Sequence, residues 1–74
     1  MLNVNQSSKI RGILALCING QSKEAAKKVN KLSKYEIAHC LGGNAFEVMP
    51  DLVDKDLAYK WENFIVRALE GFYS

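Results

Sequence analysis

The chain contains little that would cross-link it, break it or anchor it: two cysteines and one proline in 74 residues. Cys17 and Cys40 allow at most one disulfide, and each lies inside an apolar helical pattern, so both are expected to be reduced, buried thiols of a cytoplasmic protein. The longest apolar run, residues 13–18, falls far short of the roughly 20 residues that cross a bilayer. It is also too short for a secretory signal. We therefore expect no membrane partner and no secretion.

Motifs for catalysis, metal binding and phosphate binding are also lacking. The single histidine, His39, is adjacent to Cys40, but neighbouring residues on a helix point about 100° apart and cannot form a nucleophile–base pair. The paired Cys or His spacings of zinc sites are absent. Gly42 and Gly43 follow an expected helix, whereas a phosphate-binding loop precedes one. The sequence thus predicts no enzyme, no metal site and no cofactor.

What the sequence does contain is helical apolar spacing, with no stretch that alternates with period two. The first helix is predicted to begin at a cap on Ser7 or Ser8, after a frayed segment 1–6, and to end at Asn19 and Gly20, with Gly20 left-handed. Further helices are predicted over residues 23–32, 34–41, 45–49 and 54–71. The fold class is therefore all-α: a small bundle of four to five short helices, with no sheet, in one domain over residues 1–74.

Capping signals and apolar positions define the ends and inner faces of these helices. Ser22, a capping box of Ser33 with Glu36, and Asp51 or Asp54 are the predicted N-terminal caps. The predicted inner residues are Ile10, Ile13, Leu14, Cys17 and Ile18 in the first helix, Ala25, Ala26, Val29 and Leu32 in the second, Ile37, Ala38 and Leu41 in the third, Phe46 and Met49 in the short turn, and Leu57, Trp61, Phe64, Ile65, Ala68, Leu69 and Phe72 in the last. Trp61, the only tryptophan, is expected at the centre.

Charge is divided unequally between the two halves of the chain. Residues 1–35 have seven basic and one acidic residue, a net charge of +6, whereas residues 36–74 have three basic and seven acidic residues, a net charge of −4. Such a division favours either an anionic partner for the first half or contact between copies of the chain.

Lysines of the second predicted helix gather on the side opposite its apolar face. Lys23, Lys27, Lys31 and Lys34 fall within about 80° of one another, and Lys28 lies at the margin. A solvated helix face is the simplest interpretation. The alternatives are contact with nucleic-acid phosphates and contact with an acidic protein.

Residues 22–41 are weakly similar to the helix–turn–helix motif of DNA-binding proteins. The similarity places Ala26 and Val29 inside the first helix, Ile37 and Leu41 inside the recognition helix, and Ser33 at its cap. The usual turn glycine is missing. The outward residues would be Lys34, Tyr35, Glu36 and His39, of which Glu36 would repel phosphate. His39 is expected to stack near Tyr35, four positions earlier. The resemblance implies a DNA- or RNA-binding regulator.

The last predicted helix has a broad apolar face with residue types that often anchor protein interfaces. The candidates are Trp61, Phe64, Val66, Phe72 and Tyr73. The leading hypothesis is therefore a small non-enzymatic protein-interaction module, acting as a regulator or inhibitor of a larger protein machine. We expect a homodimer that contacts through this helix, with the basic second helix near the acidic last helix of the other copy.

Overall fold

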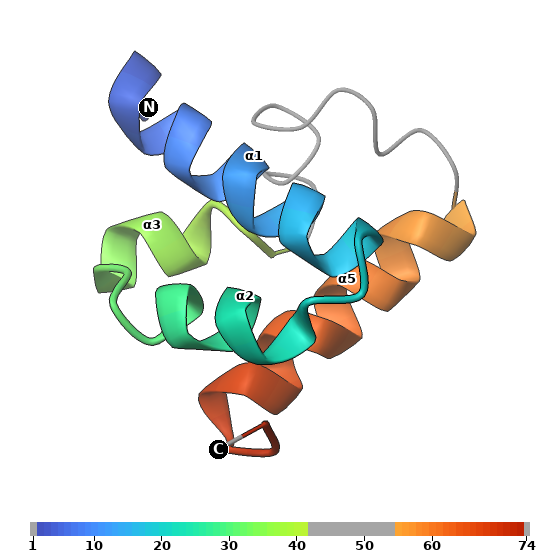
Figure 1. The fold of residues 1–74 in the computed structure, drawn as a ribbon. Helices are drawn as coiled ribbons and strands as arrows, with labels where there is room; N and C mark the ends of the chain where they lie inside the picture. The colour runs from blue at the N-terminus through green and yellow to red at the C-terminus, as the bar shows by residue number, and fades with distance from the viewer. Residues whose placement is uncertain (1, 42–54, 74) are drawn as a thin grey trace.

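The computed structural model describes residues 2–41 and 55–73, and within them it contains helices and no strand (Figure 1). The helices are α1 (Val4–Ile18), α2 (Ser22–Val29), α3 (Lys34–Ala38) and α5 (Lys55–Leu69). The all-α prediction is confirmed. The short helix predicted at 45–49, with Phe46 and Met49, and the caps predicted at Asp51 or Asp54 lie outside the described residues.

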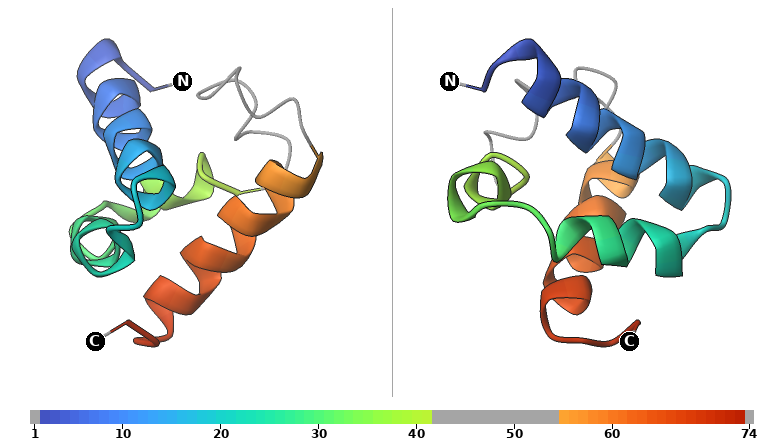
Figure 2. Two further views of the ribbon diagram at one scale, coloured as in Figure 1. Left: turned by 45° about the vertical axis from the view of Figure 1, so that its right-hand side comes forward. Right: turned by 60° about the vertical axis from the view of Figure 1, so that its left-hand side comes forward.

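Helix α2 is the element that joins the others. It packs against α1 on one side and against α5 on the other. In Figure 1, α1 and α2 run in roughly opposite directions, α3 follows at one side, and α5 crosses behind α2. Both views in Figure 2 keep α5 at an angle to α1, so the two helices diverge from each other.

The first turn of α1 begins earlier than the sequence indicated. Asn3 is the N-cap: its side chain accepts the backbone N–H of Gln6 at 2.8 Å, and the Gln6 side chain accepts the backbone N–H of Asn3 at 3.0 Å. This reciprocal pair satisfies two donors that a helix start leaves without intrahelical partners. The prediction of a cap at Ser7 or Ser8 is wrong, and residues 3–6, predicted to fray, form the capped start of the helix.

Two long helices end in the same glycine motif. After α1, Gly20 has φ +78° and the Gln21 N–H donates to the Leu16 carbonyl; after α5, Gly71 has φ +81° and the Phe72 N–H donates to the Arg67 carbonyl. Glycine adopts this left-handed conformation without the steric cost of a Cβ. The left-handed role predicted for Gly20 is confirmed.

The two short helices are shorter than predicted. α2 begins at Ser22 itself, after an N-cap at Gln21 that makes no side-chain hydrogen bond, and α3 ends at Ala38. Ser22 is therefore not the cap that the sequence suggested. The capping box of Ser33 and Glu36 is confirmed: the Glu36 N–H donates to Ser33 Oγ at 3.2 Å and the Ser33 N–H donates to Glu36 Oε1 at 2.9 Å.

One core connects the four helices. Its buried apolar residues are Ile10, Ile13, Leu14, Ala25, Ala26, Val29, Leu32, Cys40, Trp61, Phe64, Ile65 and Ala68. Trp61 is 3% exposed, and its Nε1–H donates to the Cys40 carbonyl at 2.9 Å. Asn30 links α2 to the end of α5, because its Nδ2 donates to the carbonyls of Ala26 at 3.0 Å and Ala68 at 3.3 Å.

Several predicted inner residues face outward. Ile18, Leu69 and Phe72 are exposed, as is Ala38, and Cys17 is only half-buried. Glu36, expected on the outward face of α3, is instead buried. The cause is that α1 and α5 each pack over a narrower arc than their apolar residues occupy, whereas α3 turns its capping glutamate toward α1.

Candidate interaction surfaces

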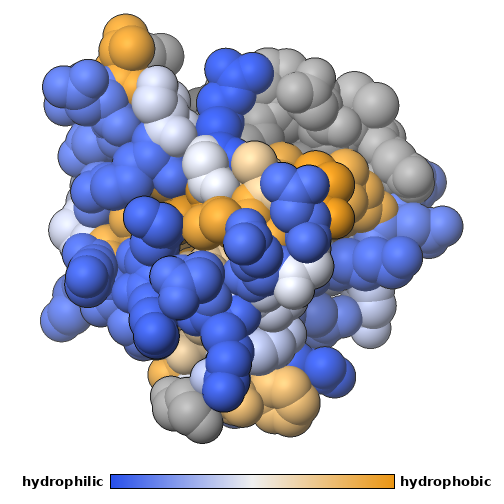
Figure 3. Space-filling view, viewed as in Figure 1, coloured by the Kyte–Doolittle hydropathy of each residue, from blue (hydrophilic) through white to orange (hydrophobic). Residues whose placement is uncertain are grey.

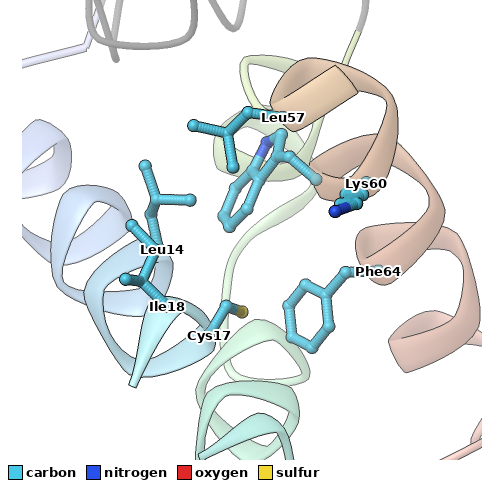
Figure 4. Close-up of a pocket in the computed structure, with 7 residues that line it drawn as sticks. Leu14, Cys17, Ile18, Leu57, Lys60 and Phe64 are labelled. Carbon is cyan, nitrogen blue, oxygen red and sulfur yellow. The ribbon is translucent and has the colours of Figure 1, made fainter. Parts of the chain in front are cut away.

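An apolar groove lies between α1 and α5. Leu14, Cys17 and Ile18 approach it from α1, and Leu57, Lys60 and Phe64 approach it from α5 (Figure 4). Buried Trp61 completes the lining, and the cavity volume is about 200 Å³. Ile18, 65% exposed, forms the rim on one side. Figure 3 shows a hydrophobic area on the same face, bordered by hydrophilic side chains.

The two thiols of the described region are not activated nucleophiles. Both cysteines are free. Burial raises the pKa of Cys17 to about 11, and burial together with the charge of Glu36 raises the pKa of Cys40 to about 11. Cys40 Sγ donates to the Glu36 backbone carbonyl at 3.3 Å. Because the thiolate is the reactive form of cysteine, neither residue is poised for nucleophilic attack at neutral pH.

A second apolar surface lies on α5, away from the core. Tyr59, Val66 and Leu69 are 69%, 43% and 42% exposed, and with Glu62 they follow one another at intervals of three or four residues, so they share one side of the helix. We refer to these four residues as the outer face of α5. Exposed apolar side chains aligned on one helix are typical of protein contact sites.

The lysine face is a continuous exposed surface. Lys23, Lys27 and Lys28 of α2 are exposed, as are Lys31 and Lys34 beyond it, and Figure 3 shows hydrophilic side chains covering this part of the molecule. Glu24 is the acidic residue of α2, and it pairs with Lys27 at 3.5 Å. This exposed pair contributes little to stability because water and salt screen it.

Glu36 does not face outward beside these lysines. It is 4% exposed, and its Oε2 lies 2.9 Å from Lys9 Nζ on α1. The hydrogen bond from the Ser33 backbone N–H, followed by that from the Lys9 ammonium, holds the pKa of the Glu36 carboxyl below its ordinary value of 4.5. The predicted outward position of Glu36 is therefore wrong, because this carboxylate is buried and paired with Lys9.

The residues assigned to the helix–turn–helix resemblance are only partly placed as expected. Ala26 and Val29 are buried, as predicted, and the rings of Tyr35 and His39 lie 4.5 Å apart. However, α3 has five residues, which is less than two helical turns. A helix this short presents fewer side chains than a recognition helix that reads several base pairs.

No family model, no curated protein and no solved structure matches this chain.

The residues predicted as interface anchors divide into two groups. Trp61 and Phe64 are buried and form the floor of the groove, and Tyr73 is half-buried with its ring 5.4 Å from that of Phe64. Val66 and Phe72 are exposed, and the Arg67 guanidinium lies 5.2 Å from the centre of the Phe72 ring. Helical spacing alone missed Tyr59 and Leu69, since it assigned Leu69 to the core.

Neither a metal cluster nor a membrane-spanning segment is present in the part of the chain that the structure describes. No three His, Cys, Asp or Glu side chains there are grouped so that they could hold a metal ion. Helices α1, α2, α3 and α5 are too short or too polar to cross a membrane.

Proposed function

We propose that this protein is a small non-enzymatic interaction module of the cytoplasm, one that regulates or inhibits a larger protein machine by binding it. The observation that carries the proposal is the outer face of α5, where large apolar side chains are exposed in a row. The raised pKa values of both free thiols support a binding role over nucleophilic chemistry.

A second copy of the chain is the partner that suits this face. Lys55 begins α5 and Glu70 follows its end, and both flank the outer face. In a two-fold antiparallel pair of α5 helices, Lys55 of each copy would lie opposite Glu70 of the other, and Tyr59 opposite Val66. This arrangement replaces the expected pairing of basic α2 with an acidic last helix, because residues 55–70 balance in charge: the bases Lys55, Lys60 and Arg67 equal in number the acids Asp56, Glu62 and Glu70.

Replacing Tyr59 and Val66 together by alanine is expected to weaken the dimer while the fold persists. Truncation of interface anchors costs about 2 kcal/mol or more, which is about 30-fold in Kd. The stability of the monomer should change by less than about 1 kcal/mol, since both side chains are largely exposed. Sedimentation at micromolar concentration, with thermal unfolding in parallel, provides both measurements.

A substitution at Glu62 is the matched control for this antiparallel arrangement. In the antiparallel pair Glu62 would lie near the two-fold axis and so approach Glu62 of the other copy. Two like charges repel by about 1 kcal/mol at short range in water. Glu62→Gln is therefore expected to tighten the dimer up to about fivefold. A parent protein that remains monomeric at high concentration, or a dimer that Glu62→Gln weakens, contradicts the proposed arrangement.

A second candidate function is DNA or RNA binding through the lysine face. The specific observation in its favour is that Glu36 is buried and paired with Lys9, so that its carboxylate does not lie on the surface beside Lys34. Each lysine that contacts phosphate releases counterions, and binding then depends steeply on salt. The short α3 favours contact with the phosphate backbone over the reading of bases.

The triple substitution of Lys23, Lys27 and Lys31 by glutamine tests this candidate. The fold should be retained, with a stability change under about 1 kcal/mol, because exposed charges contribute little. If these lysines contact phosphates, retention on duplex DNA or RNA should be lost and the log–log salt slope should fall by about 3. Absence of retention of the parent protein at low salt eliminates the nucleic-acid candidate.

A further inference from the structure

The groove between α1 and α5 has the size of one side chain. Its volume is about 200 Å³, below the roughly 300–1,000 Å³ of sites that hold whole small molecules. Its floor consists of the aromatic rings of Trp61 and Phe64, whose centroids lie 5.9 Å apart. A large aliphatic or aromatic side chain would fill such a space and bury its surface against these rings.

The shape of the groove indicates what kind of partner segment could place a side chain in it. Two helices form the walls, and they diverge instead of closing the space (Figure 2). Exposed Ile18, the last residue of α1, makes the rim of the cavity apolar and continues its lining to the surface. An apolar space between two helices, continuous with further apolar surface, is the geometry in which an amphipathic helix docks with its apolar face inward.

The charges beside the groove indicate which residues of a partner would lie next to the side chain in the cavity. Lys60 lines the groove, and Arg67 lies two turns further along the same side of α5, about 10 Å away. Among residues 2–41 and 55–73, Asp56 is the acidic residue on this side, and α1 contains none. The charge that these residues place beside the groove is therefore positive, which favours a partner with acidic residues next to its apolar face.

We propose that this groove binds an acidic amphipathic helix of a different protein, with one large apolar side chain in the cavity and a carboxylate paired with Lys60. This site goes beyond the dimer proposed above and does not depend on it, because the groove and the outer face lie on opposite sides of α5. For the same reason a second copy does not suit the groove. A copy that docked its outer face there would leave its own groove empty for another copy, and the contact would propagate as an open chain.

The test uses the intact protein and two helical peptides with the same leucine- and phenylalanine-containing apolar face. One peptide has glutamate and the other lysine on its polar face. Trp61 is the only tryptophan and lies in the groove, so its fluorescence reports occupancy directly if both peptides lack tryptophan. The acidic peptide is expected to change the Trp61 emission with a Kd below about 1 mM, and the basic peptide to bind at least fivefold more weakly.

Two charge reversals give the matched pair of variants. Lys60→Glu should weaken the acidic peptide at least fivefold and strengthen the basic one, whereas Lys28→Glu, at an exposed position of α2 outside the groove and outside the outer face of α5, should change neither more than about twofold. Ile18→Asp, at an exposed position, should weaken both peptides without unfolding the protein.

Three results would overturn the proposal. The first is equal binding of the two peptides, which would show an apolar site without preference for acidic partners. The second is an unchanged Trp61 emission with the acidic peptide at about 1 mM. The third is that the protein alone assembles into open-ended chains and that Lys60→Glu abolishes this assembly. That result would show that the groove binds a second copy of the chain. Loss of the dimer alone affects none of these measurements, so the two proposals fail separately.

Discussion

Replacing Trp61 with alanine is expected to unfold the protein or leave it without fixed tertiary packing. The side chain is 3% exposed, packs against Phe64 and donates to the Cys40 carbonyl at 2.9 Å. Removal of a large aromatic side chain from a core costs about 3–5 kcal/mol, and the whole stability of a small domain is about 5–15 kcal/mol. Circular dichroism during thermal unfolding should therefore show a much lower midpoint or no cooperative transition.

Two further variants separate the contributions of Trp61. Trp61→Phe keeps most of the apolar contact but removes the hydrogen bond that ties α5 to Cys40, and it should cost about 1–3 kcal/mol. Tyr59→Ala, at an exposed position of the same helix, should leave the transition within about 0.5 kcal/mol of the parent. Near-native unfolding of Trp61→Ala would show that the core does not depend on this ring.

The features that the sequence predicted correctly are local ones. The capping box of Ser33 and Glu36, the glycine end of α1 and the contact of Tyr35 with His39 each involve residues within five positions of one another. Their geometry follows from helical spacing alone. The cap at Asn3 was missed because residues 4–6 contribute nothing to the apolar stripe, which starts at Ile10. Apolar periodicity locates the packed part of a helix and not its polar first turn.

The features that the sequence did not predict depend on packing between distant segments. The burial of Glu36 follows from its pairing with Lys9, which precedes it by 27 positions on another helix. Leu69 is exposed because α5 packs with the preceding residue, Ala68, against α2. The Asn30 side chain at the end of α2 donates a hydrogen bond to the Ala68 carbonyl. The sequence placed Trp61 and Phe64 in the core and also among the interface candidates; their burial is confirmed, but the groove whose floor they form depends on how α1 and α5 are arranged, which helical spacing does not predict.

Replacing Glu36 with alanine is expected to be the most destabilising change at a charged position. The variant loses the capping box, worth about 1 kcal/mol, and the hydrogen-bonded ion pair with Lys9, worth about 1.5–3 kcal/mol. The Lys9 side chain is 50% exposed, so the ammonium that remains can be hydrated, and the total loss should be about 2–4 kcal/mol. Urea unfolding at pH 7 measures it, and Glu24→Ala, an exposed acidic position in α2, is the control.

The same pair should make stability depend on pH in a defined direction. The hydrogen bonds from Ser33 and Lys9 hold the pKa of Glu36 below 4.5 in the folded protein, so the folded state favours the ionised carboxylate more than the unfolded state does. Its contribution is complete above the unfolded pKa and is lost as the pH falls through the folded pKa. Stability should therefore decline below about pH 4.5, which is the ordinary pKa of the group. Glu36→Gln, which keeps an oxygen for the Ser33 N–H, should show a smaller decline over this range than the parent. An equally steep acid dependence in Glu36→Gln would show that other carboxylates control the acid unfolding, and that the pair with Lys9 does not link α1 to α3 as described.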